Sequence, residues 1–101
     1  MLIVSAGAHA QSQDKLLKKA IAGDYQAQRN LAYSYANPAT GERADKIKSC
    51  AWYQVILKSG SDKVSVGDVG NVKVYCGALS DLERVAADGQ AAELVKKIYK
   101  R

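Results

Sequence analysis

Turn-forming residues divide this chain into short segments. The positions of these turns constrain its fold more than any other feature of the sequence. The interruptions are Gly23-Asp24, Asn37-Pro38 and residues 59–62. Between them apolar side chains recur at helical spacing; Ala27, Leu31 and Tyr35, for example, are four residues apart. The pattern predicts helices over residues 12–21, over residues 25–36 and from about residue 45 to residue 58.

The segment 64–76 fits two structures. Valines alternate with polar residues at both of its ends and a glycine-rich stretch separates them, which is typical of a β-hairpin. A helical stripe is also present, formed by Val69, Val72, Cys76 and Leu79. Because a single hairpin is marginal in a helical chain, we expect a helix here, with Asp62 as a candidate cap.

The last segment begins with a helix start signal. Ser80 and Glu83 have the spacing of a capping box, which predicts a helix over residues 80–100. We expect Asp88-Gly89 to break this helix before its apolar C-terminal part. The whole chain is therefore expected to be all-α.

Composition and charge exclude several classes of protein. The 101 residues suffice for one domain, and 48% hydrophobic with 25% charged residues is ordinary for a globular chain. No apolar run approaches the roughly 18 residues that a membrane-spanning helix needs. The formal charge is +5, and a basic cluster at residues 96–101 supplies most of it. We expect a basic helix end there rather than a nucleic-acid surface.

The first residues resemble the end of an export signal. A short apolar run leads to Ala8-His9-Ala10, where small residues two apart precede a polar stretch. We expect residues 1–11 to be a remnant of such a signal, with an N-terminal extension as the alternative, and residues 12–101 to form one domain. His9 is the only histidine and receives no catalytic role. The predicted location is periplasmic or secreted.

Two cysteines suit an oxidising compartment. Cys50 and Cys76 enclose 25 residues, and a disulfide between them would constrain the unfolded chain by roughly 3 kcal/mol. The alternative is a pair of buried free thiols, since cysteine is among the most buried residue types. Two cysteines and one histidine do not make a tetrahedral metal site, so we expect neither a metal nor a cofactor.

A repeat signature runs from Ala20 to Gly60. Its first half contains Gly23-Asp24, Ala27-Gln28, Leu31-Ala32 and Tyr35, and its second half contains Asp45, Lys48-Ser49 and Trp52-Tyr53. This stretch resembles a Sel1-like repeat, a relative of the tetratricopeptide repeat. The resemblance implies a short α-solenoid of antiparallel helix pairs, with a degenerate second unit from Gly60 and with capping helices at both ends. It also implies scaffolding or regulation in the bacterial envelope.

Motifs of catalysis are weak in this sequence. Ser12 and Lys15 match the S-x-x-K pattern of acyl-transfer enzymes without its companion motifs, and Ser12 is better explained as a helix cap. A β-lactam-binding or hydrolysing Sel1-like enzyme is the alternative that the resemblance leaves open. We expect a protein that is not an enzyme.

The remaining candidate is a binding surface on the helix predicted over residues 25–36. Off its core stripe lie Gln26, Arg29, Asn30 and Tyr33. Arginine and tyrosine are enriched at interface hot spots, although a solvated face is the plainer interpretation. The prediction is a non-catalytic module that binds a partner protein through this face. A narrower form of it is an immunity protein or inhibitor of a secreted toxin or effector. No nucleic acid and no membrane span are expected.

Overall fold

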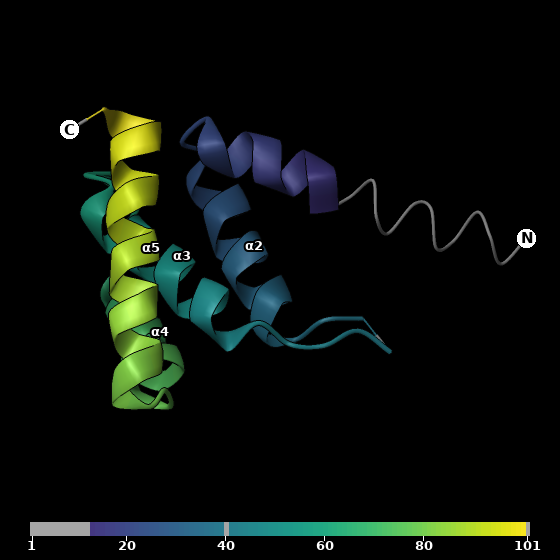
Figure 1. The fold of residues 1–101 in the computed structure, drawn as a ribbon. Coiled ribbons are helices and arrows are strands. Elements are labelled where there is room, and N and C mark those ends of the chain that lie inside the picture. Colours follow the sequence, from purple (N-terminus) through teal and green to yellow (C-terminus); the bar gives the residue numbers. More distant parts are fainter. Residues whose placement is uncertain (1–12, 40, 101) are drawn as a thin grey trace, which may run out of the picture.

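The computed structural model describes residues 13–39 and 41–100, and within them it is built from helices without any β-strand (Figure 1). The predictions that concern residues 1–12, including His9 and the cap at Ser12, lie outside the described residues. A first helix occupies residues 13–21. The other helices are α2 (Tyr25–Ala36), α3 (Lys46–Lys58), α4 (Val66–Gly77) and α5 (Asp81–Tyr99).

The expected turn residues set the helix starts. Gly23 has φ 96°, a backbone conformation that favours glycine, and the chain turns there between the first helix and α2. Asp24 then caps α2, since its carboxylate accepts a hydrogen bond from the Ala27 backbone N–H at 2.8 Å. Asp45 caps α3 in the same way.

Helix α3 is the centre of the fold. It packs against α2, α4 and α5, and every residue from Ser49 to Ile56 is buried, so the helix has no exposed face over two turns. Around it lie the small and apolar side chains Ala20, Ala27, Leu31, Ala32 and Ala91. Ser49 is accommodated among them because its hydroxyl donates a hydrogen bond of 2.8 Å to the Ala32 carbonyl.

A buried glutamine connects the two ends of the chain. Gln28 is fully buried, and its Nε2 donates to the Ala20 carbonyl and to the Tyr99 hydroxyl, both at 3.0 Å. The first helix, α2 and the last turn of α5 are therefore linked through one side chain.

The hairpin alternative for residues 64–76 is wrong, because the chain forms α4 there. The cap is Ser65 rather than Asp62, and Ser65 and Asp68 form a capping box. Only Asp68 and Cys76 of this helix are buried, so α4 is held near its two ends and exposes most of its valines. Contacts with α3 thus outweigh the strand preference of valine.

The expected break at Asp88-Gly89 is also wrong, since α5 runs through both residues without interruption. Gly89 lies on the exposed side of the helix, where a glycine costs only about 1 kcal/mol. Asp88 accepts hydrogen bonds from Gln54 Nε2 at 2.8 Å and from Arg84 Nε at 3.1 Å. These partners lower the pKa of the Asp88 carboxyl, so it is ionised in the middle of the helix.

Cys50 of α3 and Cys76 of α4 lie at disulfide-bonding distance, with 2.04 Å between their sulfur atoms, as the sequence predicted. They are buried beside Ala87 of α5. The amide of Gln54 points at both sulfur atoms, at 3.3 and 3.9 Å. Along the described ranges, no helix combines the length and the apolar character that crossing a membrane requires.

Candidate functional site

The four residues predicted to bind a partner line one surface hollow of about 280 Å³. It lies between α2, α3 and α4, and we call it the α2–α4 hollow. Gln26, Arg29, Asn30 and Tyr33 come from α2, and the structure adds Tyr53 of α3 with Asn71 and Tyr75 of α4. The predicted residues therefore share a single concave surface, although nothing in the geometry by itself identifies what fills it.

Arg29 is anchored at the edge of the hollow by a buried carboxylate. Its Nε lies 3.3 Å from Oδ1 of Asp68, whose side chain is fully buried, whereas the Arg29 side chain is 40% exposed. The two atoms form an ion pair without the alignment of a hydrogen bond. Nε itself is buried, so the exposed 40% of the Arg29 side chain belongs to its other atoms.

Asp68 is held by two further donors. The Tyr25 hydroxyl donates to Oδ2 at 2.6 Å, and the Ser65 backbone N–H donates to the same oxygen at 2.9 Å. The hydrogen bond to Asp68 raises the pKa of the Tyr25 hydroxyl, so this group remains a proton donor over the physiological range. The Tyr25 ring also lies under the Arg29 guanidinium, with 5.9 Å to the ring centroid.

Aromatic rings form the opposite wall of the hollow. Tyr53 and Tyr75 stack with ring centroids 4.7 Å apart, which joins α3 to α4. Burial raises the pKa of the Tyr53 hydroxyl to about 12. Tyr33, by contrast, is 56% exposed and stands at the mouth of the hollow.

Arg29 is the only charged residue among the described ones that line the hollow. Gln26 Nε2 donates a hydrogen bond of 3.0 Å to Asn30 Oδ1. This bond occupies the amide oxygen of Asn30 and leaves its N–H groups as donors. Together with the Arg29 guanidinium and the Tyr33 hydroxyl, these amides suit an acceptor with negative charge, such as a carboxylate.

Sequence reasoning missed the residues that support Arg29. Tyr25 and Asp68 are 43 positions apart, and no local pattern joins them. The spacing of Ser65 and Asp68 is that of a capping box, and this signal would have marked Asp68 as a structured position. It would not have revealed the ion pair with Arg29, which depends on how α4 packs.

Over the described residues, no group of three or more histidine, cysteine, aspartate or glutamate side chains is arranged to hold a metal ion. No protein-family model, curated protein or solved structure matches this chain. The resemblance to Sel1-like repeats therefore stays a prediction.

Proposed function

We propose that this chain is a non-catalytic interaction module of the bacterial envelope, which binds a partner protein in the α2–α4 hollow. The observation that carries the proposal is the anchoring of Arg29 by the buried Asp68, while the Arg29 side chain remains 40% exposed in the lining of the hollow. A side chain already held in one orientation loses little conformational entropy on binding. Arg29 is therefore suited to bind an acidic side chain of the partner.

The neighbouring groups favour a protein as the ligand. Tyr33 presents a large exposed ring beside Arg29, and these are the two residue types that dominate interface hot spots. The amides of Gln26 and Asn30 supply adaptable hydrogen bonds at the rim. A partner loop or helix end with a carboxylate and an adjacent apolar group would complement this surface.

The same proposal includes a Sel1-like arrangement, in which α2 and α3 form the clear repeat, α4 begins a degenerate second unit, and the first helix and α5 act as caps. Support comes from Gly23 and Gly60, which both have positive φ, at 96° and 80°, and lie 37 positions apart, near the period of that family. Buried Ala27 and Ala32 at the α2–α3 contact also fit the pattern of small residues in such repeats.

The envelope location rests on the cysteine pair. Disulfides persist in oxidising compartments, and Cys50 and Cys76 lie at disulfide distance. A narrower form of the proposal is an immunity protein or inhibitor that occupies a secreted toxin or effector. A small, covalently stapled module is suited to that task.

Affinity capture from an envelope extract tests the proposal. The immobilised baits are the wild-type protein, the double variant Arg29→Ala with Tyr33→Ala, and a control variant, Lys73→Ala. Lys73 is an exposed residue of α4 outside the hollow, so its replacement removes one positive charge without altering the site. Circular dichroism first establishes that all three baits are equally helical.

We expect one protein to be captured by the wild type and by Lys73→Ala and to be lost with the double variant. The same protein captured equally by the double variant would show that the hollow is not the binding site. No specific protein captured by the wild type would contradict the interaction function itself.

A further inference from the structure

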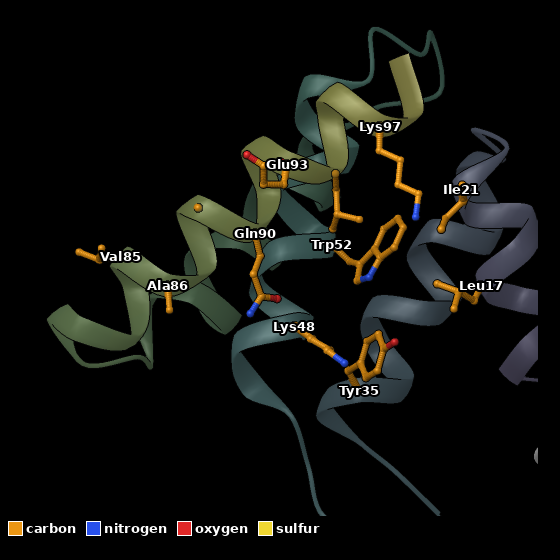
Figure 2. A pocket seen from close by; sticks show the side chains of 12 residues that line it. Leu17, Ile21, Tyr35, Lys48, Trp52, Val85, Ala86, Gln90, Glu93 and Lys97 are labelled. Atoms are coloured by element: carbon orange, nitrogen blue, oxygen red, sulfur yellow. The ribbon is translucent and has the colours of Figure 1, made fainter. Parts of the chain in front are cut away.

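A second concave surface shares no residue with the α2–α4 hollow. It is a groove of about 550 Å³ between the first helix, α2, α3 and α5, and we call it the α5 groove (Figure 2). Leu17 and Ile21 lie on one side, α5 lies on the other, and Trp52 lies between them (Figure 2). Val85 and Leu94 of α5 are among the lining residues. Its size and its apolar, aromatic lining are those of a binding site rather than of an ordinary surface depression.

The apolar surface of α5 runs along the groove and extends past it at Leu82. Leu82, Val85, Ala86 and Gly89 follow one another at the spacing of a helical stripe. Such a stripe normally faces a core, yet Leu82 is 83% exposed and Val85 is 68% exposed. A contiguous apolar strip beside a groove marks an interaction surface, because solvated helices rarely retain one.

Basic side chains stand at both ends of the groove. Figure 2 shows Lys97 reaching toward Trp52 and Ile21 from one side and Lys48 lying against Tyr35 at the other. Lys48 Nζ is 5.5 Å from the centroid of the Tyr35 ring. Among the described lining residues the only acidic one is Glu93, so the rim carries a net positive charge.

We propose that the α5 groove binds an amphipathic, acidic helix of a partner protein. The apolar face of that helix lies on Trp52 and on the stripe of α5, and its carboxylates meet Lys48 and Lys97. The stretch of α5 from Leu82 to Leu94 is about 18 Å long, which matches roughly three turns of the bound helix. The stripe also extends past the concave region at Leu82, so an extended occupant covers more of it than a small molecule would.

Two other occupants are disfavoured by charge. A second copy of this chain would bring its own net charge of +5 against the lysines of the rim. The N-terminal residues 1–12 contain an apolar run but no aspartate or glutamate, so they offer nothing to the two lysines. An acidic helix from another protein satisfies both the apolar floor and the basic rim.

The intrinsic tryptophan fluorescence of this protein can report binding in the α5 groove. Trp52 is the only tryptophan of the sequence and lines the groove, so its fluorescence responds to an occupant. The probe is a synthetic peptide of about four helical turns, with leucines at i, i+3, i+4 and i+7 spacing and glutamates elsewhere. The control peptide carries lysine in place of every glutamate.

We expect the glutamate peptide to change the fluorescence of Trp52 saturably and the lysine peptide to bind at least about tenfold more weakly. Val85→Asp should weaken the binding of the glutamate peptide about tenfold, and Lys97→Glu should also weaken it. Val66→Asp is the matched control, because Val66 is 87% exposed on α4 and lies outside the groove. Arg29→Ala should leave peptide binding unchanged, which separates this inference from the proposed function of the hollow.

Several results would overturn the inference. They include no binding of the glutamate peptide, equal binding of the lysine peptide, or wild-type affinity in Val85→Asp. If the wild-type protein sediments as a dimer and Val85→Asp sediments as a monomer, the occupant is a second copy of this chain. The last test replaces Leu2, Ile3 and Val4 by serine in the full chain. If this markedly raises the affinity for the glutamate peptide, the N-terminal segment is the occupant of the groove instead.

Discussion

Opening the covalent link between α3 and α4 should remove a large part of the stability of this protein. The test compares oxidised protein, protein reduced by dithiothreitol, and the double variant Cys50→Ala with Cys76→Ala. The pair closes a loop with a sequence separation of 26. Since α4 buries only Asp68 and Cys76, little apolar burial compensates for the lost link.

The loop length gives the expected size of the effect. The entropy of closing a loop of this size in the unfolded chain corresponds to about 3.5 kcal/mol. For a domain of this length, that loss lowers Tm by roughly 14–28 °C. Gln54 is not left without a partner by the substitutions, because its Nε2 also donates to Asp88 Oδ1 at 2.8 Å. No additional cost of an unpaired buried amide is therefore expected.

Urea unfolding followed by circular dichroism measures the free energy of unfolding of the three forms. Reduced wild-type protein keeps both sulfur atoms. The difference in the free energy of unfolding between it and the double variant therefore reports the packing of the side chains alone. If the oxidised and reduced proteins unfold within about 0.5 kcal/mol of each other, the argument from chain entropy is refuted.

Four further outcomes follow from buried or strained positions. Asp68→Asn keeps the shape of the side chain but removes the charge that faces Arg29, and should lower the free energy of unfolding by about 2 kcal/mol in urea. Tyr99→Phe removes the donor–acceptor contact with Gln28 and should cost about 1 kcal/mol in the same assay, whereas an unchanged value would show that the contact contributes nothing. Gly23→Ala should cost about 1–2 kcal/mol because φ is 96°, and not through a clash, since the nearest atom would be 3.9 Å away. Burial raises the folded-state pKa of Tyr53 to about 12. The stabilisation that comes from keeping this hydroxyl protonated is therefore complete below pH 10 and is lost as the pH rises toward 12. Ultraviolet titration that detects every tyrosine ionising near pH 10 in the folded protein would contradict this.

Local signals in the sequence predicted most of the helix starts. Asp24, Ser80 and Glu83 occupy cap positions in the structure as their spacing indicated. Such caps depend only on residues a few positions apart, so one sequence suffices to find them. Ala27 and Leu31, which recur at helical spacing, are buried in the structure.

Both the rejected hairpin alternative and the expected helix break lie where distant contacts outweigh local preference. The segment 64–76 has the valines and glycines of a hairpin, yet α3 offers it a disulfide partner in Cys50 and a stacking partner in Tyr53. The Asp88-Gly89 pair resembles a helix stop, but Gln54, 34 positions earlier, donates to Asp88 inside a continuous α5. No window of a few residues contains those partners.

The candidate site was predicted in part for the same reason. The four residues of α2 that line the hollow share one helix face, which the helical period reveals directly. Asp68 and Tyr75 belong to α4, whose place beside α2 depends on tertiary packing. The sequence therefore located one wall of the site and not the group that orients Arg29.

The bond between Gln28 and Tyr99 also bears on the order in which this chain completes its fold during synthesis. The two residues are 71 positions apart, and the bond joins the end of α5 to the same amide that donates to the Ala20 carbonyl of the first helix. While α5 is still being translated, Gln28 lacks this partner and the central α3 lacks one of its three neighbouring helices. Contacts of such large sequence separation form late, because the loop between them must close first. A nascent chain of this design stays incompletely packed until nearly all of the described residues have been made.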